Sequence, residues 1–148
     1  MLKNLSPVLG PELLYTLRAM GHGDEIAIVD GNYPAENAGP ANVIRADGHD
    51  AVRIMDAILS VMPLDEAVPE AAFRPNVPGK PEHLEPVMED FARILTKHEP
   101  KMQLTGLEPA AFYERVRKAY AVVGTSERRL YGNVVLKKGV IRPGEGPD

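Results

Sequence analysis

Four segments of the chain carry apolar residues at the spacing of an α-helix. Residues three and four positions apart lie on one side of a helix, so an apolar stripe at that spacing predicts a helix packed against a core. These stripes predict helices over residues 11–20, 50–62, 84–95 and 112–120. Pro11 fits the first position of the first helix, Asp50 suits the N-cap of the second, and Pro63 ends the second.

Short apolar runs with β-branched residues predict strands among these helices. The runs predict strands over residues 25–30, 43–45, 121–124 and 133–136, with a weaker strand within residues 67–73. A further strand is expected between the third and fourth helices, without assigned bounds. This alternation favours an α/β layered domain with a mostly parallel sheet.

The remaining segments are expected to be loops. Residues 75–81 are rich in proline and predict a mobile surface excursion. Residues 142–148 hold too few apolar side chains to pack, which predicts a poorly ordered tail. A chain of 148 residues has the usual size of one domain. We therefore expect residues 1–148 to form a single domain around one core.

Composition narrows the choice of partners and compartments. The chain is 44% hydrophobic and 26% charged, as in ordinary globular proteins. Its 17 basic residues are scattered and are outnumbered by 21 acidic ones, which argues against nucleic acid as a partner. The absence of cysteine excludes disulfides and thiolate chemistry. No apolar run approaches the roughly 20 residues of a membrane span, and the N-terminus lacks a signal-peptide pattern, so we expect a cytoplasmic protein without a membrane partner.

His22 is the strongest candidate for proton-transfer chemistry. It lies between Gly21 and Gly23 just after the first predicted helix, where two glycines free the backbone and let the ring project from a loop. A histidine both gives and takes protons near neutral pH. The alternative is that His22 caps the helix by bonding its last carbonyl groups.

Two further positions offer groups that bind hydroxyls. Asp30 stands at the end of the first predicted strand, where open α/β sheets place ligands; alternatively, its carboxylate caps the turn that follows. Gly132 lets the backbone turn so that Tyr131 and Asn133 face the same small ligand, and a phenol and an amide together suit the hydroxyls of a sugar. The alternative for residues 131–133 is an ordinary hairpin turn.

Other kinds of functional site lack their motifs in this sequence. His49, His83 and His98 show no spacing typical of zinc sites, so no metal is expected. Neither a dinucleotide-binding glycine pattern nor a phosphate-binding loop is present. We therefore expect chemistry that needs no cofactor.

Taken together, the chain resembles the L-fucose mutarotase and D-ribose pyranase family, and the fucose branch in particular. The resemblance covers most of the chain, and the order and spacing of its segments make it specific. The matching segments are residues 5–7, 11–14, 20–25, Asp30 with residues 33–35, residues 44–48, 112–115, 118–123 and 131–140.

The resemblance implies a fold, an assembly and roles for residues. It implies a three-layer α/β/α fold in rings, commonly pentamers stacked as decamers, with active sites at subunit boundaries. By this resemblance His22 is the proton donor, Asp30 contacts the sugar, and residues 131–133 bind it. The implied reaction interconverts the anomers of a monosaccharide, most simply L-fucose, by ring opening and reclosure without a cofactor.

One position departs from the family pattern. Fucose-type members place a sugar-binding arginine a few residues before the Phe112-Tyr113 motif, and Pro109 stands there in this chain. Glu108 lies beside it, and Arg74 or Arg129 is a candidate to fill the vacancy. The departure leaves other interpretations open: a non-catalytic sugar-binding or transport-accessory protein, a pyranase acting on D-ribose, or a degenerate nucleotide-binding module.

Overall fold

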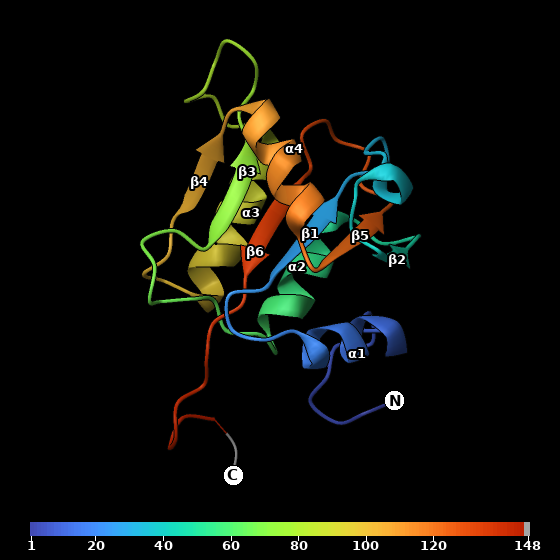
Figure 1. Ribbon diagram of the computed structural model, residues 1–148, viewed down its shortest axis with the longest axis vertical. Coiled ribbons are helices and arrows are strands. Elements are labelled where there is room, and N and C mark those ends of the chain that lie inside the picture. The colour runs from blue at the N-terminus through green and yellow to red at the C-terminus, as the bar shows by residue number, and fades with distance from the viewer. Residues whose placement is uncertain (147–148) are drawn as a thin grey trace.

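Helices and strands follow one another in the order that the hydrophobic pattern predicts (Figure 1). The computed structural model describes residues 1–146. The helices are α1 (Pro11–Ala19), α2 (Ala51–Leu59), α3 (Pro86–His98) and α4 (Pro109–Lys118), with a 3-10 turn η1 (Ala35–Asn37). The strands are β1 (Glu25–Val29), β2 (Asn42–Ala46), β3 (Ala72–Pro75), β4 (Leu104–Leu107), β5 (Ala121–Thr125) and β6 (Val134–Lys137).

The six strands form one mixed sheet in the order β2-β5-β1-β6-β3-β4. Strand β6 runs antiparallel to both of its neighbours, β1 and β3, and the remaining pairings are parallel. We call the side of the sheet where β1 to β5 end, and where β6 begins, its carboxyl end. The opposite side is its amino end. The expected α/β fold with a mostly parallel sheet is confirmed.

Helices cover both faces of the sheet, which gives three layers (Figure 1). One core cluster joins the sheet to α1, α2 and α3 and includes Phe91 of α3. A second cluster, around Phe112 of α4, joins the other face to α4 and η1. Burial of these apolar side chains is the main force that holds the layers together. Within residues 1–146, no helix is both long and apolar enough to cross a membrane.

The local signals for helix starts are confirmed, and several predicted bounds are wrong. The Asp50 side chain accepts a hydrogen bond from the backbone N–H of Arg53 and caps α2. Helix α4 begins at Pro109, three residues before the predicted start, because proline at the first helical position needs no hydrogen-bond partner. Strand β3 runs on to Pro75 rather than ending at Phe73. The predicted bound was too early because the next residue, Arg74, is polar, although it is buried within the strand.

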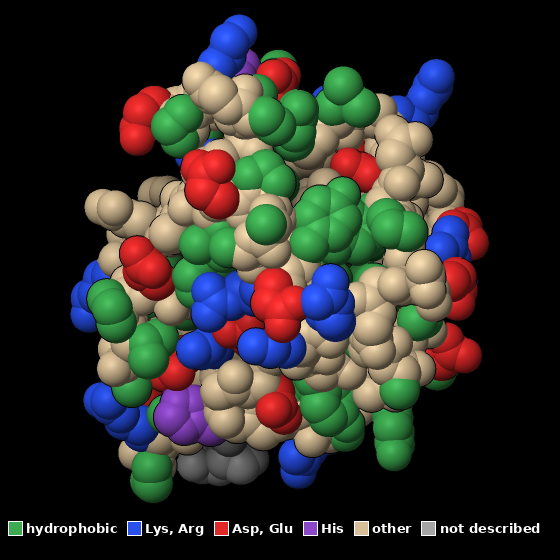
Figure 2. Space-filling view, turned by 45° about the horizontal axis from the view of Figure 1, so that its top comes forward, with side chains coloured by type: hydrophobic (Ala, Val, Ile, Leu, Met, Phe, Trp, Pro, Cys, Tyr) green, Lys and Arg blue, Asp and Glu red, His purple; other side chains and the backbone are tan. Residues whose placement is uncertain are grey.

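Charged side chains of both signs are interspersed on the face shown in Figure 2. Near its centre, basic and acidic groups alternate rather than forming a stripe of one sign. Elsewhere in the structure opposite charges also pair locally, as Arg115 and Lys137 do with Glu25. This visible face therefore offers no basic stripe of the kind that binds nucleic acid.

Candidate functional site

The loop that carries His22 lies at the amino end of the sheet and is pinned by backbone bonds. Gly23 donates its N–H to the Lys138 carbonyl, and Lys138 donates its own N–H to the Asp24 carbonyl, both at 2.9 Å. Gly23 has a φ of +85°, in the left-handed region that favours glycine. The Asp24 carboxylate accepts the N–H of Gly21 at 2.7 Å. The loop is thus fixed to the end of β6.

Lys138, rather than His22, caps the end of α1. Its ammonium group donates to the Leu17 carbonyl at 2.7 Å and to the Met20 carbonyl. A cation suits this place because the last carbonyls of a helix carry partial negative charge. Burial lowers the pKa of Lys138. The helix-capping role suggested for His22 is therefore taken by another residue.

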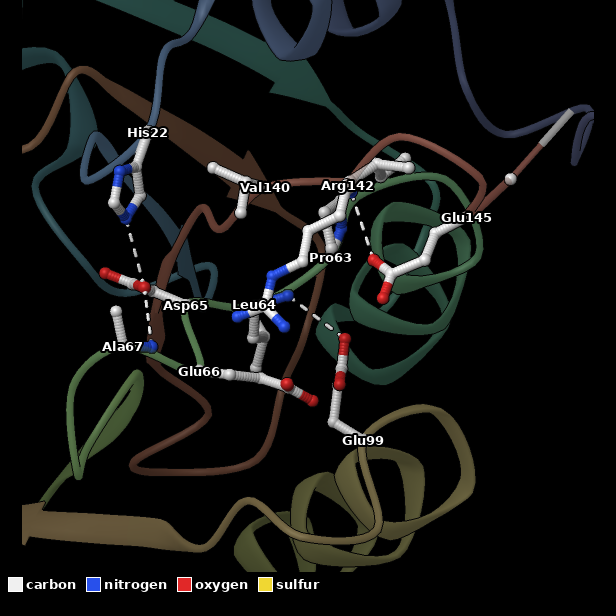
Figure 3. Close-up of a pocket in the computed structure, with 12 residues that line it drawn as sticks. His22, Pro63, Leu64, Asp65, Glu66, Ala67, Glu99, Val140, Arg142 and Glu145 are labelled. Atoms are coloured by element: carbon white, nitrogen blue, oxygen red, sulfur yellow. Dashed lines mark hydrogen bonds and ion pairs between the residues drawn. The ribbon is translucent and has the colours of Figure 1, made fainter. Parts of the chain in front are cut away.

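His22 contacts a buried carboxylate that the sequence did not reveal. Its Nε2 lies 3.1 Å from Oδ1 of Asp65, and the two side chains point toward each other in Figure 3. The Asp65 side chain is 6% exposed, whereas that of His22 is 50% exposed. Burial would raise the pKa of Asp65, but the N–H of Ala67 and the His22 ring outweigh it and hold that pKa below its usual value. Asp65 is thus suited to stay ionised beside the ring.

A pocket of about 350 Å³ opens beside this pair. Its walls come from the segment after α2, from Glu99 after α3 and from the chain that follows β6. In Figure 3 the Arg142 side chain extends across the pocket toward Leu64. Cavities of this size hold small ligands. The pocket therefore has room for a monosaccharide, with an imidazole at its wall that can transfer protons.

Asp30 and Asn133 form a buried pair at the carboxyl end of the sheet. The backbone N–H of Asp30 donates to Oδ1 of Asn133 at 2.8 Å, and Nδ2 of Asn133 donates to Oδ2 of Asp30 at 3.1 Å. Oδ1 of Asp30 also accepts the N–H groups of Asn32 and Tyr33, so the carboxylate does cap the turn after β1. Each carboxylate oxygen has two lone pairs, so the group retains acceptor capacity for a ligand.

Residues 131–133 form a tight turn next to Asp30. Tyr131 has a φ of +62°, which is rare for a residue with a side chain. A Cβ at Gly132 would lie 2.6 Å from Cγ of Glu127 and 3.4 Å from Cβ of Asp30, so only glycine fits there. The turn therefore brings Tyr131 and Asn133 to the same end of the sheet as Asp30.

His22 does not join this group within one chain. His22 lies before the start of β1, whereas Asp30 lies directly after its end. The five residues of β1 span roughly 16 Å. The structure thus unites Asp30 with residues 131–133 at one end of the sheet and places His22 with Asp65 at the other. We call the two groups the carboxyl half-site (Asp30 and residues 131–133) and the amino half-site (His22 and Asp65).

The two arginines suggested for the vacancy at Pro109 have different surroundings. The guanidinium of Arg129 is bound to two carboxylates, those of Glu127 and Asp90, which raise its pKa. Arg74 lies buried at the end of β3, and among residues 1–146 no carboxylate oxygen lies within 4.0 Å of it. Nor do any three His, Asp or Glu side chains of the described chain gather as they would around a metal ion.

Comparison with known proteins identifies relatives over nearly the whole chain. A sequence model of the RbsD / FucU transport protein family matches residues 3–141. The chain is 43% identical to the fucose mutarotase of Mus musculus over 146 residues, which are 95% of each chain. It is also 43% identical to the fucose mutarotase of Homo sapiens over 146 residues, 95% of this chain and 94% of that one.

Solved structures give the same picture. The fucose mutarotase of Streptococcus pneumoniae, in complex with L-fucose, superposes with a TM-score of 0.87 at 38% identity, over 95% of this chain and all of that one. RbsD of Bacillus subtilis, complexed with D-ribose, superposes with a TM-score of 0.71 at 20% identity, over 96% of this chain and 100% of that one. The second likeness is one of fold alone.

Proposed function

The chain belongs to the RbsD / FucU transport protein family, and on that premise we propose that it is an isomerase that interconverts the α and β anomers of L-fucose. Relatives that match over nearly the full length are fucose mutarotases, one of them solved with L-fucose. The ribose-bound relative shares only 20% identity, so L-fucose is favoured over D-ribose.

The reaction consists of two proton transfers around one bond cleavage. The anomeric hydroxyl loses a proton while the ring oxygen gains one, the bond between the anomeric carbon and the ring oxygen breaks, and an aldehyde forms. Rotation about the adjacent carbon–carbon bond and reclosure then give the other anomer. Positioned acids and bases typically accelerate such transfers by about 10²–10⁴-fold. Proton transfer by side chains is therefore sufficient for this chemistry.

The amino half-site supplies the proton donor in this proposal. Asp65 holds the Nε2 side of the His22 ring, and among residues 1–146 no partner contacts its Nδ1. The Asp65 carboxylate orients the ring, as a carboxylate behind a catalytic histidine generally does. Nδ1 is then the ring atom that gives its proton to the sugar ring oxygen.

The carboxyl half-site binds the sugar. Asp30 accepts a hydrogen bond from a sugar hydroxyl, while Tyr131 and Asn133 donate and accept further bonds that fix the ring. Gly132 allows the tight turn that places these two side chains, because a Cβ there would lie 2.6 Å from Cγ of Glu127. Because Asp30 and Asn133 are already hydrogen-bonded to each other, the binding surface is preorganised.

The two half-sites meet only if two copies of the chain come together. His22 and Asp30 lie at opposite ends of β1, so the amino half-site of one copy would face the carboxyl half-site of its neighbour. Such a head-to-tail contact generates a ring when the rotation between neighbours closes, and our proposal is a pentamer or a decamer of stacked pentamers. The proposal also includes a cytoplasmic location, which the cysteine-free composition supports.

The observation that carries the proposal is the His22–Asp65 pair beside a sugar-sized pocket. It is tested by NMR saturation transfer between the anomers of L-fucose, with D-ribose compared alongside. His22→Ala should abolish the acceleration given by the wild type. The matched control is His83→Ala, because His83 is also 50% exposed and lies 3.1 Å from a carboxylate, that of Glu85. Binding of L-fucose without faster exchange in the wild type would instead indicate a sugar-binding protein.

A further inference from the structure

Arg74 is a buried cation at the carboxyl end of the sheet. It is 6% exposed and lies in β3, one strand away from the β6 end that carries Asn133. Its guanidinium donates to the carbonyls of Pro75 and Pro81 and to Oδ1 of Asn76, at 3.1 to 3.2 Å. All three acceptors lie further along the chain, so the side chain turns toward the carboxyl end of the sheet.

The hydrogen-bonding capacity of Arg74 is only partly used. A guanidinium has five N–H donors, and three bonds account for three of them. Its Nε is fully buried without an acceptor among the described residues. An unpaired buried donor is costly, so such a group is retained where it serves a further purpose.

The charge of Arg74 is also uncompensated. Its hydrogen-bond partners are neutral carbonyl and amide oxygens. Burial lowers the pKa of Arg74, and the charge of Glu82 offsets this lowering only in part. By contrast, Arg129 has both Glu127 and Asp90 as partners. Buried charges are normally paired. Arg74 is therefore a buried guanidinium at this end of the sheet whose charge is not compensated by a carboxylate of the described residues.

The surroundings of Arg74 are built to hold it. Gly106 lies opposite Arg74 on β4, and a Cβ there would lie 2.2 Å from Oδ1 of Asn76 and 3.0 Å from Cζ of Arg74. Asn76 in turn donates to Oε1 of Glu108 at 2.9 Å. The bonds of Arg74 thus lead through Asn76 to Glu108, the residue before Pro109.

We propose that Arg74 is a sugar-binding residue that donates hydrogen bonds to hydroxyl oxygens of the monosaccharide at the carboxyl half-site. It supplies this guanidinium from β3. The inference rests on the proposed function, because it assigns a binding group for the same sugar. An arginine on a different strand approaches the ring from a different side, so Arg74 also influences which sugar is preferred.

The test measures sugar binding and anomer exchange separately. L-fucose half-saturation and maximal exchange are determined by saturation-transfer NMR, and dissociation constants by calorimetry, for the wild type and Arg74→Met. Methionine keeps the length of the side chain and removes the charge and the donors. The control is Arg53→Met, because Arg53 is an exposed arginine on α2. Thermal midpoints report whether each variant folds.

Arg74→Met is expected to raise the half-saturating L-fucose concentration about tenfold or more, since a hydrogen bond to a charged group is lost. Its thermal midpoint should not fall, because an uncompensated buried charge is removed. Unchanged L-fucose affinity in Arg74→Met would overturn the assignment.

The design separates this inference from the proposed function. If the wild type binds L-fucose without accelerating exchange, the proposed activity fails, yet the dissociation constants of Arg74→Met still decide the role of Arg74. If the wild type accelerates exchange and Arg74→Met has the same affinity, only the role of Arg74 fails. Should Arg74→Met not fold, Arg74→Lys takes its place with the same expected loss of affinity, because lysine lacks the planar fork of donors.

Discussion

At the scale of single residues, Asp65 determines how His22 can act. It holds the ring through Nε2 while keeping a second bond to the N–H of Ala67 at 3.0 Å. We predict that Asp65→Asn lowers maximal anomer exchange about a hundredfold, since the ring loses the carboxylate that orients it for proton transfer. L-fucose affinity should change little, because the sugar is bound mainly at the other half-site.

Saturation-transfer NMR gives the maximal exchange and the half-saturating L-fucose concentration of Asp65→Asn, and its thermal midpoint shows whether the change also causes a packing defect. The matched control is Glu85→Gln, which removes the carboxylate from the comparable pair with His83. Unchanged maximal exchange, or a loss that only accompanies a lower thermal midpoint, would show that Asp65 has no more than a structural role.

Glu127 makes the stability of the fold depend on pH in the acid range. Its hydrogen bonds with Arg129 outweigh burial and lower its pKa from the ordinary value of 4.5. A carboxyl group whose folded pKa lies below its unfolded pKa stabilises the fold above the unfolded value, and this contribution is lost as pH falls through the folded value. The wild type should therefore lose stability below about pH 4.5 more steeply than Glu127→Gln.

Thermal midpoints of both proteins between pH 7 and pH 3 check this expectation for Glu127. The two midpoints should differ most at pH 7 and converge in acid. Glu89→Gln, a change at an exposed position of α3, serves as the control and should run parallel to the wild type. Parallel curves for Glu127→Gln would contradict the stabilising role of its charge.

At the scale of elements, the end of α1 depends on Lys138. Its ammonium group bonds the Leu17 and Met20 carbonyls, and the backbone of the same residue pins the loop of His22. We predict that Lys138→Met lowers the free energy of unfolding by about 1–3 kcal/mol, because a helix end loses its charged hydrogen bonds. Anomer exchange should fall as well, since the loop loses its support.

Urea unfolding gives the stability of the Lys138 variant, and hydrogen exchange shows where it loosens. Protection should drop in the last turn of α1 and in residues 21–24. Lys137→Met is the matched control, because the neighbouring lysine only pairs with Glu25 at 3.7 Å. Equal losses for both lysines would contradict the specific role of Lys138.

Elements with a clear local pattern could be predicted, and those defined by distant neighbours could not. The apolar stripes and the Asp50 cap located the helices because these signals lie within a few residues of each other. Strand β4 received no bounds, because its four residues are only half-buried and include Gly106. The bounds of β3 were wrong because the buried Arg74 interrupts its apolar run.

The candidate site divides in the same way. His22, Asp30 and the turn at residues 131–133 stand out locally through glycines and strand ends. Asp65 does not stand out locally. Its position is set by Leu64, the residue before it, which forms an isolated β-bridge with Lys138 of a distant segment. That contact brings the carboxylate to a histidine 43 positions away, which no local pattern can show.

At the scale of the whole molecule, the separation of the half-sites predicts complementation between inactive variants. His22→Ala and Asp30→Asn damage opposite ends of β1. If neighbouring copies share each site, a co-assembled mixture of the two should recover about a quarter of wild-type exchange, since random mixing restores both halves in that fraction of contacts. Exchange is measured by NMR on mixtures unfolded and refolded together.

The control for complementation is a mixture of His22→Ala with Asp65→Asn. Both changes lie in the amino half-site, so no contact in this mixture regains an intact half-site, and exchange should stay at the level of the better variant. Mass spectrometry establishes that the copies have mixed. Mixed assemblies of His22→Ala and Asp30→Asn without recovery would contradict a shared site.

The reversed direction of β6 limits how the protein can change its sugar preference. This strand of four residues begins next to Asn133 and ends next to Lys138, so one short segment places a binding group and a catalytic loop at the same time. An insertion or deletion within it would turn every following side chain to the opposite face. New specificities must therefore arise from side chains outside β6, such as those at positions 74 and 109, because the strand cannot adjust one half-site without displacing the other.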